Sequence, residues 1–118
     1  MKLDYCVLGT NNMQQAIEFY DALFEGTALT QAFKTDRMNY WQCESFAFAI
    51  AIPFDGLPAT NGNGTMFGIN VGSEEEVNRL YEQAIKLGGS CEGEPGVRGP
   101  KYSAYIRDLD RNKIVFSA

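Results

Sequence analysis

At 118 residues the chain is long enough for one domain that buries a single hydrophobic core. Its composition, with 45% hydrophobic and 21% charged residues, is that of an ordinary globular protein. The formal net charge is −5, and no run of Lys or Arg could follow a phosphate backbone, so neither nucleic acid nor an anionic membrane is an expected partner.

No apolar stretch approaches the length of a membrane span, and the first residues lack the apolar core of a signal peptide. A cytoplasmic location is therefore expected. The three cysteines, Cys6, Cys43 and Cys91, are odd in number and widely spaced. This spacing predicts reduced packing residues rather than a disulfide framework or a metal-binding knuckle.

The first module, residues 1–53, begins with a strand-like segment at residues 3–9. The polar turn Thr10-Asn11-Asn12 follows and can cap a helix. Apolar residues then recur at helical spacing until Gly26 ends that helix. Three further strands are predicted, at residues 27–34, 38–44 and 46–52.

Residues 54–64, rich in Gly, Asn and Pro, are predicted to link this module to a second one at residues 65–118. The second module repeats the order of the first. A strand is predicted at residues 65–71, and the helix after it opens with Ser73 and Glu76, which are spaced as a capping box.

Gly88 and Gly89 are predicted to end this second helix. After a short strand, residues 92–100 contain Gly and Pro and are predicted to form a loop that borders the ligand site. A strand at residues 101–108 and a final strand at residues 113–117 complete the module.

Each module therefore has the order βαβββ. One helix cannot cover both faces of its sheet, so we expect the two modules to lie side by side. The expected architecture is an α+β fold with a curved sheet of about eight strands and its helices on the convex side. The concave side then forms a cleft, the natural place for a ligand.

This plan resembles the vicinal-oxygen-chelate superfamily, which groups glyoxalase I, bleomycin-resistance proteins, fosfomycin-resistance enzymes and extradiol dioxygenases. The resemblance covers nearly the whole chain. Its most specific pieces are Phe19-Tyr20 in the first helix and the closing segment 106–114, which is similar to the family's Arg-Asp-Pro-Asp-Gly-Asn turn. Leu109 replaces the proline and Arg111 the glycine, so either Arg111 or Asn112 must take the left-handed conformation.

The resemblance implies a divalent metal on the concave face, held by His or Glu from the first and last strands of each module. The chain contains no histidine. The positions that match the ligands hold Tyr5, Met66, Val115 and either Ala49 or Ala51, which together cannot form an octahedral site. We therefore expect no metal and no other cofactor, and metal-dependent glyoxalase I or dioxygenase activity is disfavoured.

Alternation along the strands predicts which residues line the cleft. In residues 46–52, bulky side chains alternate with alanines, so the bulky face should pack on the first helix and the alanine face should look into the cleft. The segment 38–44 offers Trp41 or Tyr40 as a stacking surface, because its parity is ambiguous. The predicted ligand-binding residues are Tyr5, Trp41, Ala49, Met66, Asn70, Tyr105, Arg107 and Val115.

Such a lining suits a planar or apolar small molecule, including an anionic one, held by stacking and one positive group. Two alternatives stay open for these residues. In the first, Tyr5 and Met66 fill a closed core. In the second, Arg107 only forms an ion pair with Asp108, Asp110 or another acid near the turn.

The leading hypothesis is a metal-independent small-molecule binding protein that resembles the bleomycin-resistance branch and forms a homodimer. No nucleophile–base pair is visible, so no catalytic residue is assigned. The alternatives are a metal-independent lyase or isomerase, with Tyr5, Tyr105 or Arg107 polarising an oxygen of a small carbonyl compound, and a structural module with a filled cleft. Bleomycin itself is not the expected ligand, since Arg107 and Lys113 make the predicted cleft cationic.

Overall fold

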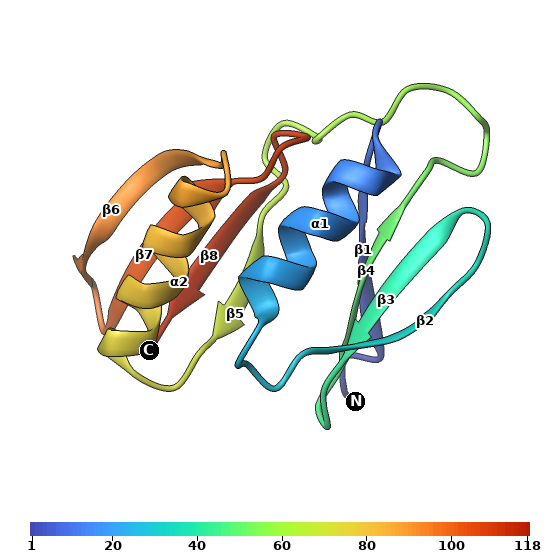
Figure 1. Ribbon diagram of the computed structural model, residues 1–118. Coiled ribbons are helices and arrows are strands. Elements are labelled where there is room, and N and C mark those ends of the chain that lie inside the picture. Colours follow the sequence, from blue (N-terminus) through green and yellow to red (C-terminus); the bar gives the residue numbers. More distant parts are fainter. The chain divides into compact units, whose positions relative to one another are not determined.

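The computed structural model describes residues 1–118, which divide into two compact units at residues 1–60 and 61–118 (Figure 1). The division falls within the segment predicted as a linker. Hydrogen bonding places the eight strands in two four-stranded sheets, one in each unit. Neither helix is long and apolar enough to cross a lipid bilayer.

Unit 1 contains the first βαβββ set. Its sheet, named sheet 1, has the strand order β1-β4-β3-β2, with β1 parallel to β4 and the other neighbours antiparallel. The elements are β1 (Tyr5–Gly9), α1 (Met13–Phe24), β2 (Thr30–Lys34), β3 (Met38–Gln42) and β4 (Ala47–Ala51).

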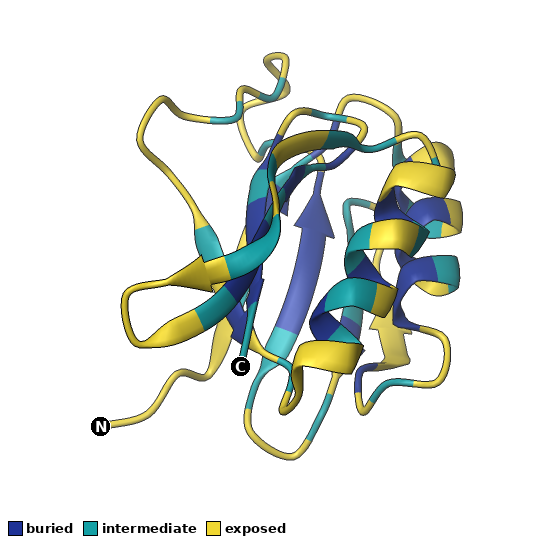
Figure 2. Cartoon of the chain, turned by 90° about the vertical axis from the view of Figure 1, so that its left-hand side faces the viewer, coloured by how far each residue is buried: buried dark blue, intermediate teal, exposed yellow.

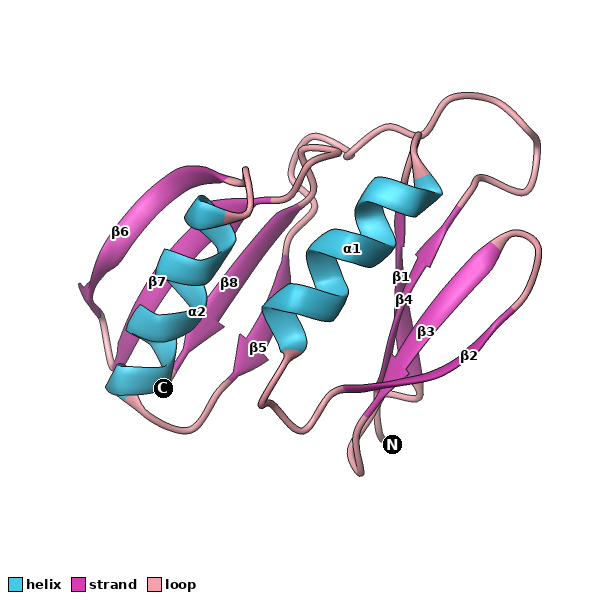
Figure 3. Ribbon diagram, in the orientation of Figure 1, coloured by secondary structure: helices cyan, strands magenta, loops and turns pink.

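Unit 2 repeats this topology, as Figure 3 shows. Its sheet, named sheet 2, has the order β5-β8-β7-β6, again with the first pair parallel and the others antiparallel. The elements are β5 (Phe67–Asn70), α2 (Glu74–Lys86), β6 (Ser90–Arg98), β7 (Lys101–Arg107) and β8 (Lys113–Ser117). The predicted α+β fold of two βαβββ modules is therefore confirmed.

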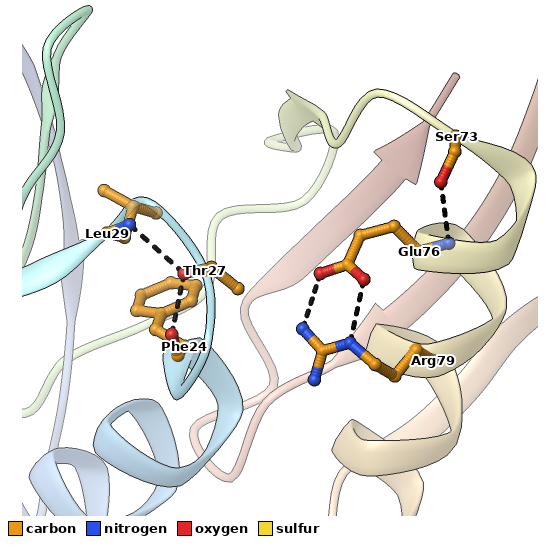
Figure 4. Close-up of polar contacts among 6 residues, drawn as sticks. All are labelled: Phe24, Thr27, Leu29, Ser73, Glu76 and Arg79. Carbon is orange, nitrogen blue, oxygen red and sulfur yellow. Dashed lines mark hydrogen bonds and ion pairs between the residues drawn. The ribbon is translucent and has the colours of Figure 1, made fainter.

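Polar side chains fix both ends of α1. Asn12 is the N-cap, and its Oδ1 accepts from the backbone N–H of Gln15 at 3.1 Å. At the other end, the Thr27 hydroxyl donates to the carbonyl of Phe24 at 2.7 Å and accepts from the N–H of Leu29 at 3.1 Å (Figure 4). These bonds satisfy backbone groups that the helix itself leaves unpaired.

Ser73 caps α2, as the sequence predicts. Its Oγ accepts from the N–H of Glu76 at 3.2 Å (Figure 4). The Glu76 carboxylate pairs with Arg79, whose Nε lies 2.8 Å from Oε2. At the far end, the N–H of Gly88 donates to the carbonyl of Ile85, with Gly88 in the left-handed region at φ 102°.

The core of unit 1 is an aromatic cluster between α1 and sheet 1. The Tyr20 ring centroid lies 4.8 Å from that of Phe48 and 5.7 Å from that of Trp41, and Phe24 packs edge-on against Phe48 at 5.3 Å. The Trp41 Nε1–H donates to Asp21 at 2.9 Å, which satisfies the one polar group of the indole. Pairs of this kind contribute about 0.5–1.5 kcal/mol each beyond area burial.

The core of unit 2 is mostly aliphatic and lies between α2 and sheet 2, where α2 runs across one face of the sheet (Figure 1). The helix contributes Val77, Leu80 and Ala84, all at most 2% exposed. The sheet contributes Ala104, Ile106, Ile114 and Phe116, all 0% exposed. Buried residues gather on the strands and on the helix sides turned toward them (Figure 2), so one face of each sheet is committed to the core.

The prediction of a loop at residues 92–100 is wrong, because β6 continues through Arg98 and pairs with β7. Two register shifts, between Cys91 and Gly93 and between Gly93 and Gly96, accommodate the extra residues as bulges. β6 is an edge strand, where Pro95 removes no hydrogen bond from the interior of the sheet. A Gly- and Pro-containing segment at a sheet edge can therefore remain a strand.

Candidate functional site

The helix-free face of sheet 1 carries a line of aromatic side chains, Tyr5, Tyr40 and Phe33, named here the aromatic row. Phe33 stacks on Tyr40 with ring centroids 4.4 Å apart and an interplanar angle of 16°. Tyr5 meets Tyr40 edge-on at 6.5 Å. Tyr5 is 57% exposed and Phe33 55% exposed, so this row is open to solvent.

Strand alternation explains the position of the row. Trp41 and Phe48 point to α1, where both rings pack against Tyr20, so their strand neighbours Tyr40 and Ala49 point to the opposite face. Trp41, predicted to bind the ligand, is 1% exposed and belongs to the core, so that prediction is wrong. Tyr40, its neighbour in the chain, lies in the aromatic row instead.

The small residues predicted to line the cleft are covered by their neighbours. Ala49 pairs with Val7 on β1 and with Tyr40 on β3, so larger side chains flank its methyl group, and it is 0% exposed. Val115 is 8% exposed, and its Cγ1 lies 3.2 Å from the place where a Cβ on Gly68 would stand. Neither residue offers a surface of its own to a ligand.

Two more predicted residues of unit 2, Met66 and Asn70, lie just before the start and at the end of β5. Met66 precedes the strand and is 49% exposed. The Asn70 Oδ1 accepts from the N–H of Gly72 at 2.9 Å and so shapes the turn that leads to α2. The exposures of Tyr5 and Met66 do not match the alternative in which both fill a closed core.

The helix-free face of sheet 2 gathers positive charge around Tyr105. The Arg98 guanidinium carbon lies 5.0 Å from the centroid of the Tyr105 ring, and the Lys113 Nζ lies 5.4 Å from it. Arg107 donates to Glu92 from Nε at 2.9 Å and to the carbonyl of Arg111 from Nη1 at 2.9 Å. Arg107 therefore pairs across the sheet with an acid that sequence reasoning did not select.

Asp108 shapes the closing turn. Its Oδ1 accepts from the N–H groups of Asp110 and Asn112, each at 2.9 Å, and its Oδ2 accepts from the Asn112 side chain at 3.0 Å. Arg111 takes the left-handed conformation, with φ 69°. Of the two residues that could take the left-handed conformation of this turn, Arg111 rather than Asn112 takes it.

Arg98 is the residue of this face that the sequence did not indicate. Its guanidinium donates to the carbonyls of Glu94 at 2.6 Å, Gly96 at 3.4 Å and Ser103, which ties the bulged β6 to β7. The proximity of Gly93 to Arg98 and Tyr105 depends on the bulge register, which no local pattern reveals. A Cβ on Gly93 would lie 3.0 Å from the Tyr105 ring and 3.2 Å from the Arg98 Nη2.

The donor atoms of this chain do not fit the divalent metal that the family resemblance implies. No group of three or more Cys, Asp or Glu side chains is close enough to share an ion. Of the positions that match the ligands, only Tyr5 and Met66 offer a side-chain donor, a phenol and a thioether, and neither is a favoured ligand of Mg²⁺, Mn²⁺ or Zn²⁺.

Together, the fold and these two faces define a class: a protein of two βαβββ units whose helix-free sheet faces present aromatic and cationic side chains. The family model described as the Glyoxalase/Bleomycin resistance protein/Dioxygenase superfamily matches residues 2–116. The chain therefore belongs to this superfamily, as the resemblance implied. Among curated protein sequences, none matches the chain.

Solved structures agree with the family. The chain is similar to a glyoxalase/bleomycin resistance protein from Albidiferax ferrireducens T118, with 31% identity, a TM-score of 0.91 and coverage of 97% of this chain and 95% of that one. A glyoxalase-related enzyme from Fulvimarina pelagi gives 18% identity, a TM-score of 0.81 and coverage of 99% and 87%. A lactoylglutathione lyase from Agrobacterium tumefaciens gives 18% identity, a TM-score of 0.72 and coverage of 97% of this chain and 90% of that one. The last two likenesses show the fold alone.

Proposed function

We propose that the chain is a metal-independent small-molecule binding protein that holds its ligand on a helix-free sheet face. The aromatic row carries this proposal. Exposed aromatic rings aligned on one face have a free-energy cost in water, and contact with an apolar or planar molecule removes that cost. Phe33 and Tyr40 are already stacked, so little side-chain entropy is lost when a ligand adds to the row.

The donor chemistry supports binding without a metal. The two exposed residues at the matching positions are a phenol, Tyr5, and a thioether, Met66, which suit contact with carbon-rich ligands and not ligation of a hard cation. No Ser or Cys nucleophile stands beside a base on either face, and burial raises the pKa of the Cys6 thiol to about 12. That thiol stays protonated at neutral pH and is a poor nucleophile.

The test is a thermal-shift screen of neutral planar compounds in buffer that contains EDTA. A compound that raises the unfolding midpoint is then titrated against Phe33→Ala and Phe54→Ala. Phe54 is 90% exposed and lies outside the aromatic row, so it is the matched control. One stacking ring contributes about 0.5–1.5 kcal/mol, so Phe33→Ala should weaken the Kd about 2- to 13-fold. Phe54→Ala should leave the Kd unchanged. Equal losses in both variants, or no stabilising compound at all, would contradict the proposal.

The proposal includes a homodimer. β2 lies at the edge of sheet 1, and all five of its residues are exposed. An uncovered edge strand that carries Phe33 is a template for pairing with another chain. Sedimentation velocity at micromolar concentration should show a dimer, and a monomer that persists across that range would contradict this part of the proposal.

A further inference from the structure

The helix-free face of sheet 2 is strongly cationic, although the chain has a net charge of −5. Four basic residues meet here: Arg98, Arg107, Arg111 and Lys113. One carboxylate, that of Glu92, serves two of them, since its Oε1 lies 2.9 Å from the Arg107 Nε and 3.7 Å from the Arg111 Nη2.

Arg98 and Lys113 have no acidic partner. The ion pairs of the chain are Arg79–Glu76, Arg107–Glu92 and Arg111–Glu92, and neither residue takes part in one. The carbonyl oxygens that accept from Arg98 carry no net charge, so its positive charge remains uncompensated. Lys113 is partly buried with its Nζ over the Tyr105 ring.

Three of these basic residues act on the carboxylate of Glu92. The hydrogen bond from Arg107 holds the pKa of Glu92 below its ordinary value, and the charges of Arg107, Lys113 and Arg111 lower it further. The fields of these cations therefore overlap at one place on the face. An added anion there would meet the same favourable field.

The cations are also held in position before any ligand arrives. Arg98 is fixed by carbonyls of β6 and β7, and the Tyr105 ring is confined by the backbone of Gly93. Lys113 and Arg107 are paired residues in the ladder between β8 and β7, with the Tyr105 position two residues away on β7. Preorganised donors lose less entropy on binding than flexible surface lysines do.

We propose that Lys113, Arg98 and Arg107, grouped around Tyr105, form a binding site for the oxyanion group of a small ligand, a carboxylate or a phosphate. This inference rests on the proposed function and names the chemical class of the ligand. Lys113 offers three N–H donors without an acidic partner, Tyr105 offers a phenol, and the guanidiniums supply further positive charge. Three basic residues are too few to follow the phosphates of a nucleic acid, so a small molecule is the expected ligand.

The test uses three probes: sodium benzoate, its neutral isostere benzamide, and inorganic phosphate. Each is titrated at low ionic strength into ¹⁵N-labelled protein, with the amide shifts of residues 103–107 and 113–115 as the readout. Saturable shifts at these residues are expected with benzoate or phosphate, and several-fold weaker ones with benzamide. The anion that binds more tightly shows whether the site prefers a carboxylate or a phosphate.

Variants locate the site. Lys113→Gln should weaken anion binding at least about fivefold, and Lys113→Arg should restore it. Lys86→Gln removes the same charge from the end of α2 and should leave binding unchanged. Equal weakening by Lys113→Gln and Lys86→Gln, or benzamide binding as tightly as benzoate, would overturn the oxyanion site while leaving the proposed function standing. Failure of the anions and of every neutral compound in the screen would overturn both.

Discussion

Arg111 provides a sharp test of the turn between β7 and β8. Its φ of 69° lies in the region that L residues avoid, while its side chain donates to the Ser90 Oγ at 2.7 Å and approaches Glu92. Arg111→Gly and Arg111→Ala both remove the side-chain contacts. The difference between the two variants therefore isolates the cost of the backbone conformation.

The expected difference follows from two opposing effects. A left-handed conformation costs an L residue about 1–2 kcal/mol, and glycine avoids this cost. Glycine also makes the unfolded chain more flexible, which lowers stability by about 0.4–1 kcal/mol. Arg111→Gly should accordingly be more stable than Arg111→Ala by about 0.5–1 kcal/mol in urea denaturation.

Glu82, an exposed residue in the middle of α2, is the control position. Helical backbone does not favour glycine, so Glu82→Gly should be less stable than Glu82→Ala by about 1 kcal/mol. The sign of the Gly–Ala difference should thus reverse between the two positions. An Arg111→Ala variant as stable as Arg111→Gly, or more so, would refute the reasoning about this turn.

Three further predictions concern the core, the buried thiol and the aromatic row. Phe48→Ala should lower the free energy of unfolding by about 3–5 kcal/mol, because Phe48 is 0% exposed between Tyr20 and Phe24; a loss below about 1 kcal/mol would contradict the packing. Burial raises the pKa of the Cys6 thiol from its ordinary 9.0 to about 12, so iodoacetamide at pH 8 should modify it far more slowly in folded than in urea-unfolded protein, as mass spectrometry can measure. Because the folded pKa is the higher one, the stability that the protonated thiol contributes is complete below pH 9 and falls as the pH rises toward 12. Tyr5→Phe should at most weaken ligand binding, whereas loss of turnover of a small carbonyl compound with binding retained would favour a metal-independent lyase or isomerase.

Local signals in the sequence were sufficient for the fold. The capping residues Asn12 and Ser73 mark helix starts because their side chains bond the backbone within the same turn of chain. The repeated order of elements predicts the repeated topology because both units solve the same packing problem, one helix on one sheet face.

The site was harder to predict because it depends on strand parity and pairing. In β3 both Tyr40 and Trp41 are aromatic, so alternation alone does not show which one faces α1; packing of Trp41 on Tyr20 decides it. In β6, Pro95 and two glycines indicate a loop locally, but pairing with β7 overrides that preference. The contact between Arg98 and the Tyr105 ring could not be predicted, because it depends on the register shifts in β6.

The central claim is that this chain binds a small molecule without a metal. The most direct measurement takes a stabilising compound from the screen and determines its Kd by calorimetry, first in EDTA and then with Zn²⁺, Ni²⁺ or Mn²⁺ in place of the chelator. The same Kd is expected in all four buffers, and the metals alone should not shift the unfolding midpoint. A Kd at least tenfold tighter with one of these ions, or binding that EDTA abolishes, would contradict it.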